Sequence, residues 1–170
     1  MSLLNGIASF TKSLEDRKIP YGIIGGLAVF AYGGERTTFD VDFLVDGQHR
    51  EALLQLATTT DFKVIHENAE VVQLSGSVQI DVIFANRAAT QAMLTRVHKI
   101  GKLPFPVVEA EDLIGLKIQG FVGDRSREFR DKGDILTILK NVQILDFKRI
   151  KEYADIFNVW PEIEDLKKRI

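Results

Sequence analysis

The segment at residues 39–45 limits the fold of this chain more than any other feature of the sequence. Its odd positions are apolar, and Asp40 and Asp42 stand between them. Because successive side chains of a strand point to opposite faces, the two carboxylates project side by side from one face. Asp has a poor strand propensity, and neighbouring like charges repel unless a cation lies between them. The pattern therefore predicts a strand that presents oxygen ligands to a divalent metal, most often magnesium.

A glycine pair, Gly25 and Gly26, precedes this strand. The pair lies between residues 21–24, which predict a short apolar strand, and residues 27–32, which predict a short helix. Glycine has no Cβ to block the approach of a ligand, so backbone N–H groups at this junction suit a phosphate. In a strand–helix–strand context, the glycine pair and the Asp-x-Asp segment together are a more specific signal of a phosphate and metal site than either feature alone.

A third carboxylate, Asp81, lies in another segment that favours β-structure. Residues 71–74 and 78–84 flank Ser-Gly-Ser and predict a hairpin. If the second arm of this hairpin neighbours the Asp-x-Asp strand, three carboxylates converge. The alternative is that Asp81 lies on a solvated sheet face, and we favour convergence.

The remaining hydrophobic pattern is typical of helices joined by short strands. We expect helices at 2–17, 48–60, 88–99, from 111 onward, and at 127–141, 146–157 and 161–169, with strands at 62–66 and 107–108. The proline-bearing connection at 101–106 separates a core of sheet and helices, residues 1–100, from a helical part, residues 101–170. We expect the helical part to pack on the core as one globular unit. In the helix at 127–141, the residues expected to face inward are Phe129, Ile135, Leu136 and Leu139.

A lysine falls within the apolar arc of the helix that begins at Glu111. With about 100° between residues, Lys117 lies near the middle of the arc made by Leu113, Ile114, Leu116, Ile118 and Phe121. Lysine is rarely buried unless it is paired. Either the alkyl part of Lys117 lies along apolar surface and its ammonium group reaches solvent, or the ammonium group reaches a negative group, a phosphate or an aspartate. We favour the second. The acidic residues near the start of the next helix, Asp131 and Asp134, also fit a solvated first turn.

Composition restricts the class of protein. The chain has 170 residues, of which 45% are hydrophobic, and can bury a core as one globular domain. Its formal charge of -2 gives no general attraction to nucleic acid, so binding to a DNA duplex is not expected. The absence of cysteine excludes disulfides and fits a cytoplasmic protein. No apolar run reaches the roughly 20 residues that a membrane span needs, and the N-terminus lacks the pattern of a cleaved signal.

The order and spacing of these motifs resemble the nucleotidyltransferase fold of the DNA polymerase β superfamily. This is an α+β fold with a small mixed sheet flanked by helices, here with a C-terminal helical extension. Within it, the chain is most similar to the small stand-alone enzymes of the AbiEii-like or MNT-like type. The resemblance covers roughly residues 20 to 140 and rests on the segments Arg36–Asp42, Glu111–Lys117 and Arg130–Asp134, together with the glycine pair and Asp81.

The resemblance implies transfer of a nucleoside monophosphate from a nucleoside triphosphate (NTP) to a hydroxyl of a protein, an RNA or a small molecule. It implies that Asp40, Asp42 and Asp81 are catalytic and hold Mg²⁺, as two ions, or Mn²⁺. The residues implied in nucleotide binding are Gly25, Gly26, Arg36, Thr38 and Lys117. Arg36 fits equally a role in tying the turn to the following strand. Supporting roles fall to Arg130, Asp131 and Asp134, the two aspartates by orienting Lys117 or Arg36.

Two alternatives to an enzyme remain open. The first is a catalytically degenerate nucleotidyltransferase fold that binds or regulates a cognate partner protein, as in a toxin–antitoxin pair; in it, the acidic group binds metal structurally or not at all. Gly26 stands where many members have a serine that touches the triphosphate, which slightly favours this alternative. The second, a nucleic-acid-binding module, is weaker because the chain is acidic and shows no aromatic and basic stripe.

Overall fold

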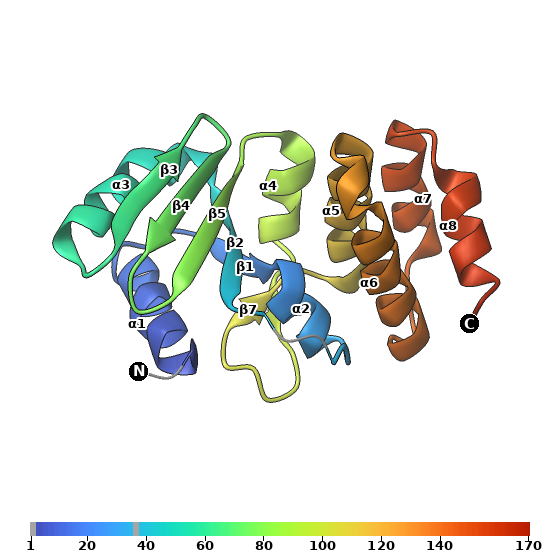
Figure 1. Cartoon of the computed structure of the whole chain (residues 1–170), viewed down its shortest axis with the longest axis horizontal. Helices are drawn as coiled ribbons and strands as arrows, with labels where there is room; N and C mark the ends of the chain where they lie inside the picture. Colours follow the sequence, from blue (N-terminus) through green and yellow to red (C-terminus); the bar gives the residue numbers. More distant parts are fainter. Residues whose placement is uncertain (1–2, 36–37) are drawn as a thin grey trace. The chain divides into compact units, whose positions relative to one another are not determined.

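The computed structural model of the chain describes residues 3–35 and 38–170 (Figure 1). Its α-helices are α1 (Leu3–Asp16), α2 (Gly25–Ala31), α3 (Arg50–Thr59), α4 (Ala88–Leu94), α5 (Ala110–Gly123), α6 (Glu128–Asn141), α7 (Phe147–Ile156) and α8 (Trp160–Lys167). Its strands are β1 (Tyr21–Ile24), β2 (Asp40–Asp46), β3 (Lys63–Glu67), β4 (Val71–Ser75), β5 (Gln79–Ala85), β6 (His98–Lys99) and β7 (Pro106–Val107). Two 3₁₀ turns, Gly47–His49 and Arg125–Arg127, precede α3 and α6.

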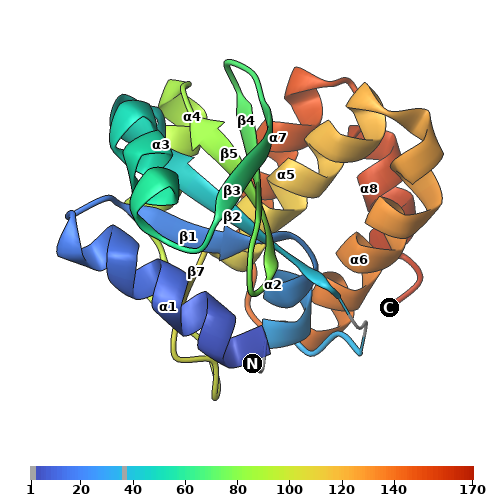
Figure 2. The same cartoon turned by 60° about the vertical axis from the view of Figure 1, so that its left-hand side comes forward.

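The strands form one mixed sheet in the order β3-β4-β5-β2-β1-β7-β6. Strand β2 lies inside this sheet, antiparallel to β1 and parallel to β5. Strands β4 and β5 pair antiparallel across their turn, which confirms the predicted hairpin, and Figure 2 shows β3, β4 and β5 side by side. The prediction of an α+β fold with a small mixed sheet is confirmed.

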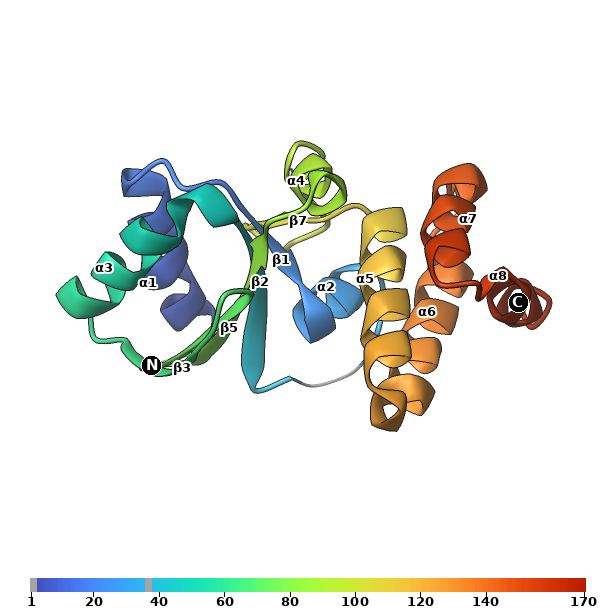
Figure 3. The ribbon, with the colours of Figure 1, turned by 90° about the horizontal axis from the view of Figure 1, so that it is seen from above.

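One face of the sheet is covered by α1 and α3, which lie on the same side of it in Figure 3. Phe10 of α1 packs edge-on against Phe43 of β2, with ring centroids 5.1 Å apart, and against Phe62, at 5.4 Å. Phe43 is fully buried. Because Asp40 and Asp42 alternate with Phe43 along β2, their side chains project from the opposite face.

The chain forms two compact units. The first unit contains residues 3–27 and 38–108, and so holds the whole sheet with α1, α3 and α4. The second contains residues 28–35 and 109–170, in which α5 packs against α6 and α7, and α8 packs against the same two helices. No helix among residues 3–35 and 38–170 is long and apolar enough to cross a membrane.

The structure corrects the helix predicted at 88–99. This helix ends at Leu94, and His98–Lys99 instead pairs with Pro106–Val107. The Thr95 hydroxyl donates to the carbonyl of Ala92 at 2.7 Å, a local bond that competes with continuation of the helix. Apolar spacing alone did not show this end.

Two phenylalanines lie outside the core, contrary to prediction. Phe129, expected to face inward, is 95% exposed, because it lies about two and a half turns before Ile138 and therefore on the opposite side of α6. Phe39, assigned to the apolar face of the predicted strand, is 85% exposed. It precedes the first residue of β2 and gains no cover from the sheet.

Candidate active site

The three predicted acidic residues lie on neighbouring strands of the first unit. Asp42 of β2 is directly beside Asp81 of β5 in the parallel register, and Asp40 is two residues before Asp42 on the same face. Adjacent strands are about 4.8 Å apart, so the side chains of Asp42 and Asp81 are immediate neighbours. The structure therefore places the three acids on one face, near the beginning of two neighbouring parallel strands.

Gly25 lies against this acidic group. It follows the last residue of β1, Ile24, which pairs with Asp42, and begins α2. Its φ of +65° is a conformation that L side chains rarely adopt. A Cβ at this position would lie only 1.8 Å from Oδ2 of Asp42. The close approach of the Asp42 carboxylate to bare backbone is possible only because residue 25 is glycine.

Thr38 contacts Asp40 through its side chain. Its hydroxyl oxygen is 2.8 Å from Oδ1 of Asp40 and 2.7 Å from the backbone oxygen of the same residue. The hydroxyl can donate to either oxygen and so holds the exposed Asp40 at the start of β2. Arg36, the other predicted nucleotide ligand of this segment, lies outside the described residues.

Asp81 has a neighbour that the sequence did not indicate. Gln73 of β4 is directly opposite Asp81, and its Nε2 donates to Oδ1 of Asp81 at 3.1 Å. Burial raises the pKa of the Asp81 carboxyl, and the charge of Asp40 adds to this, while the bond from Gln73 opposes it. A carboxylate with a raised pKa is better suited to accept a proton than an ordinary surface aspartate.

The acidic group is suited to share a metal with a ligand. Within residues 3–35 and 38–170, no three acidic or imidazole side chains lie close enough together to hold a metal ion by themselves. Magnesium usually takes one or two carboxylates from a protein and completes its octahedron with water and substrate phosphates. Asp42 and Asp81, which are neighbours in the register, can supply two such carboxylates, and Asp40 is two residues from Asp42 on the same face.

Lys117 lies in the second unit and does not extend to solvent. The residue is 5% exposed, and its Nζ is 3.2 Å from Oδ1 of Asp131 and 2.7 Å from Oδ2 of Asp134. Nε of Arg127 contacts Oδ2 of Asp131 at 3.1 Å. The two buried carboxylates are thus balanced by two cations. Asp131 and Asp134 are not a solvated first turn, and the predicted supporting residue Arg130 is exposed.

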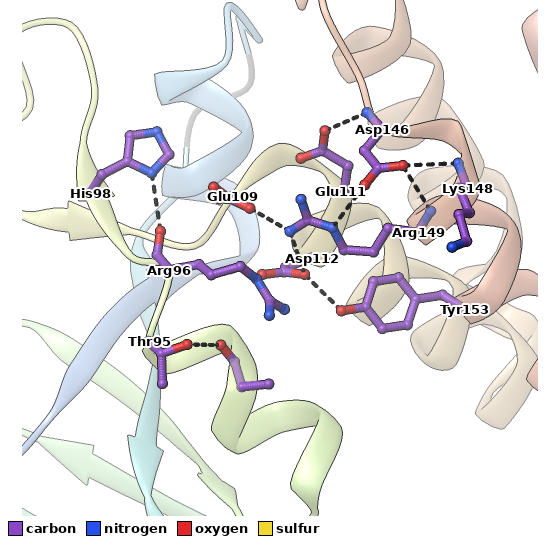
Figure 4. Close-up of polar contacts among 11 residues, drawn as sticks. Thr95, Arg96, His98, Glu109, Glu111, Asp112, Asp146, Lys148, Arg149 and Tyr153 are labelled. Carbon is purple, nitrogen blue, oxygen red and sulfur yellow. Dashed lines mark hydrogen bonds and ion pairs between the residues drawn. The ribbon is translucent and has the colours of Figure 1, made fainter.

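A second polar network links α5 to α7 (Figure 4). Asp112 is fully buried and accepts a bond of 2.7 Å from the Tyr153 hydroxyl. Arg149 pairs with Glu109 and lies 3.6 Å from Asp112, and Glu111 accepts from the backbone N–H of Asp146 at 2.7 Å. The sequence indicated only that a helix begins at Glu111, and it gave no partner for Glu111 or Asp112. Their burial against α7 was missed, and the polar residues of α7 gave no distinguishing signal.

Tyr32 belongs to the same unit as these acids. Burial raises the pKa of its hydroxyl, and the charges of Glu111, Glu109 and Asp112 raise it further. The start of α5 is therefore a strongly negative environment. Its buried acids are contacted by Arg149 and by the Tyr153 hydroxyl.

Comparison with known proteins identifies the family. The family model described as "Nucleotidyl transferase of unknown function (DUF2204)" matches residues 3–170. A search of curated proteins found no match.

Solved structures with the same fold include three nucleotidyltransferases or nucleotidyltransferase-like proteins. ANT(2″)-Ia, solved with adenylyl-2″-tobramycin, is 16% identical to this chain with a TM-score of 0.69. The match covers 93% of this chain and 98% of the ANT(2″)-Ia chain. A nucleotidyltransferase-like protein from Paracoccidioides brasiliensis is 16% identical with a TM-score of 0.63, covering 98% of this chain and 92% of its own. The lincosamide adenylyltransferase LnuA, bound to lincomycin, is 17% identical with a TM-score of 0.54, covering 80% of this chain and 96% of its own.

Proposed function

Since this chain belongs to the nucleotidyl transferase family whose model spans residues 3–170, we propose that it transfers a nucleoside monophosphate from an NTP to a hydroxyl, with Mg²⁺. The observation that carries the proposal is the register that sets Asp81 directly beside Asp42, on the face that also presents Asp40. Three carboxylates on one face of two neighbouring strands repel one another unless a positive partner lies between them. A divalent metal ion supplies that partner and also neutralises the triphosphate that binds to it.

The residues of the candidate active site have separate proposed roles. Asp40, Asp42 and Asp81 would hold the metal, with Thr38 orienting Asp40 through its hydroxyl. Glycine at position 25 lets the Asp42 carboxylate lie against the backbone where α2 begins. The backbone N–H groups at Gly25 and Gly26 are proposed to bind the triphosphate. Bound there, Mg²⁺ would neutralise triphosphate oxygens and favour ionisation of the attacking hydroxyl.

The reaction itself is a single displacement. The acceptor oxygen forms a bond to the α-phosphorus, and the bond from that phosphorus to the bridging oxygen breaks, so that pyrophosphate leaves with the electron pair. The acceptor's proton passes to the Asp81 carboxylate, whose raised pKa suits this role. Arg36 is proposed to neutralise charge on the departing pyrophosphate. Lys117, paired with Asp131 and Asp134, is proposed to keep the helices of the second unit in place.

The acceptor proposed for first tests is a small hydroxylated molecule. This choice is supported by likeness in fold and chain coverage to ANT(2″)-Ia and LnuA, whose structures hold an adenylylated aminoglycoside and a lincosamide. An RNA end and a protein hydroxyl are the further acceptors to include.

The test has a binding step and a transfer step. We expect the melting temperature to rise with Mg²⁺ and at least one of ATP, GTP, CTP and UTP, because a ligand that binds only the folded state stabilises it. With that NTP labelled at the α-phosphate, wild type should label an acceptor, whereas the variant Asp40→Ala with Asp42→Ala should not. Equal labelling by both proteins would exclude the proposed site. No thermal shift with any of the four NTPs would favour the degenerate binding protein instead.

A further inference from the structure

We propose that Gln73 is a positioning residue of the candidate active site, which fixes the orientation of the Asp81 carboxylate. The inference rests on the proposed function, and no motif in the sequence pointed to it. Gln73 and Asp81 are paired residues of β4 and β5, and Nε2 of Gln73 lies 3.1 Å from Oδ1 of Asp81. Both side chains are half-buried.

The surroundings of Gln73 restrict its own movement. Its neighbours along β4, Val72 and Leu74, are fully buried on the other face of the strand. Their packing fixes the backbone of β4, and the antiparallel register with β5 then aims the Gln73 side chain at Asp81. The Gln73 side chain is long enough to reach the Asp81 carboxylate, and strand β4 holds it pointing toward that carboxylate.

The chemistry of this contact explains why an amide suits the position. A glutamine amide donates hydrogen bonds without adding charge, so it directs the carboxylate without competing with a metal for it. The bond engages Oδ1, which fixes the plane of the carboxylate and hence the direction of Oδ2. Groups that orient metal-binding side chains in this way commonly change metal affinity or activity by about 10-fold to 100-fold when removed.

A matched control exists on the same two strands. Gln79 of β5 also reaches across to β4, where its Nε2 donates to the hydroxyl of Ser75 at 3.0 Å. Its partner is a hydroxyl rather than a carboxylate. Gln79 is also the register partner of Asp40 on β2, so loss of its amide removes a cross-strand bond beside the same acidic group but leaves the bond to Asp81 intact.

The experiment measures Mn²⁺ binding to the full chain by electron paramagnetic resonance, in the presence of a non-hydrolysable analogue of the NTP that raises the melting temperature. The proteins compared are wild type and the single variants Gln73→Met, Gln79→Met and Asp81→Asn. Methionine keeps the length of glutamine and removes the donor. We expect Gln73→Met to weaken Mn²⁺ binding by about 10-fold to 100-fold. We expect Gln79→Met to weaken Mn²⁺ binding clearly less than Gln73→Met does, because the hydrogen bond to Asp81 is kept. Both methionine variants should melt at similar temperatures.

The outcomes separate this inference from the proposed function. Wild-type affinity in Gln73→Met, or equal weakening in both methionine variants, overturns the role of Gln73. If Gln73→Met keeps wild-type affinity while Asp81→Asn loses Mn²⁺ binding, the proposed site stands and only the role of Gln73 fails. If wild type itself binds no Mn²⁺, the proposed metal site fails, and the role of Gln73 fails with it.

Discussion

At the scale of single residues, position 25 requires two separate properties of glycine. Its φ of +65° costs about 1–2 kcal/mol for a residue with a Cβ, and that Cβ would also overlap the Asp42 carboxylate. We therefore expect Gly25→Ala to lower the melting temperature and to abolish stabilisation by Mg²⁺ and NTP, because Asp42 must move. Thermal melts with and without these ligands measure both effects.

Gly101 provides the matched control for this variant. It has a φ of +57°, but nothing lies within 4 Å of the position where a Cβ would stand. Gly101→Ala should show the backbone strain alone and keep the response to Mg²⁺ and NTP. An equal loss of this response in both variants would show that backbone strain, not displacement of Asp42, is responsible.

Asp81 is expected to lower the stability of the free protein while it serves the reaction. Burial raises the pKa of its carboxyl, so the folded state favours the protonated form. The contribution of protonated Asp81 to the free energy of unfolding is then fully present below the ordinary Asp pKa of about 3.9. It is lost as the pH rises through the pKa that Asp81 has in the folded state. We expect Asp81→Asn to be more stable than wild type at pH 7, with the difference vanishing in acid, and to slow transfer by about 10²-fold to 10⁴-fold.

Chemical unfolding in the presence of a chelator at several pH values measures the first effect, and labelled nucleotide transfer measures the second. The amide that Asp81→Asn introduces still has an oxygen that can accept from Gln73, so the hydrogen bond between the strands is kept. A variant that is less stable than wild type at pH 7 would show that the Asp81 carboxylate stabilises the free protein.

At the scale of elements, the pairing of α5 with α6 depends on one buried cation. Lys117 lies between Asp131 and Asp134, and both carboxylates are buried. Removing one partner of a buried ionic group leaves uncompensated charge and costs about 3–5 kcal/mol. We expect Lys117→Met to lose stability of this order, measured by urea unfolding.

An exposed pair gives the contrast for this measurement. Lys12 and Asp16 of α1 are 3.0 Å apart, but both side chains are largely in solvent. Lys12→Met should cost about 0–1 kcal/mol. Adding Asp131→Asn and Asp134→Asn to Lys117→Met should restore part of the loss, because the uncompensated charges are then removed. A Lys117→Met protein as stable as wild type would rule out this assignment.

The sequence predicted local patterns well and distant partners poorly, for a physical reason. Alternation along β2 and the Ser-Gly-Ser turn are set by neighbouring residues, so the strand, the hairpin and the shared face of Asp40 and Asp42 could be predicted. The partner of Lys117 could be restricted only to a negative group, because the packing of α5 on α6 selects among several carboxylates. The same holds for Gln73, whose importance depends on the register of two strands.

At the scale of the whole molecule, the second unit is not a continuous stretch of chain. It combines residues 109–170 with residues 28–35. Nδ2 of Asn141 donates to the carbonyl of Gly33 at 3.4 Å, and a Cβ at Gly33 would lie 3.0 Å from the Asn141 side chain. Gly33 is thus in close contact with the end of α6. No signal in the sequence at 28–35 indicated membership of the helical part.

A fragment of residues 109–170 should therefore be less stable than the same helices in the full chain. It lacks Tyr32, which is half-buried, and Gly33, so the fragment exposes the surface that these residues cover. Small domains are marginally stable, and loss of a packed segment removes a large share of their stability. We expect helical circular dichroism with a broad, weakly cooperative urea transition, where the full chain unfolds sharply. A fragment that unfolds as cooperatively and at the same urea concentration as the full chain would show that residues 28–35 are dispensable to the helices.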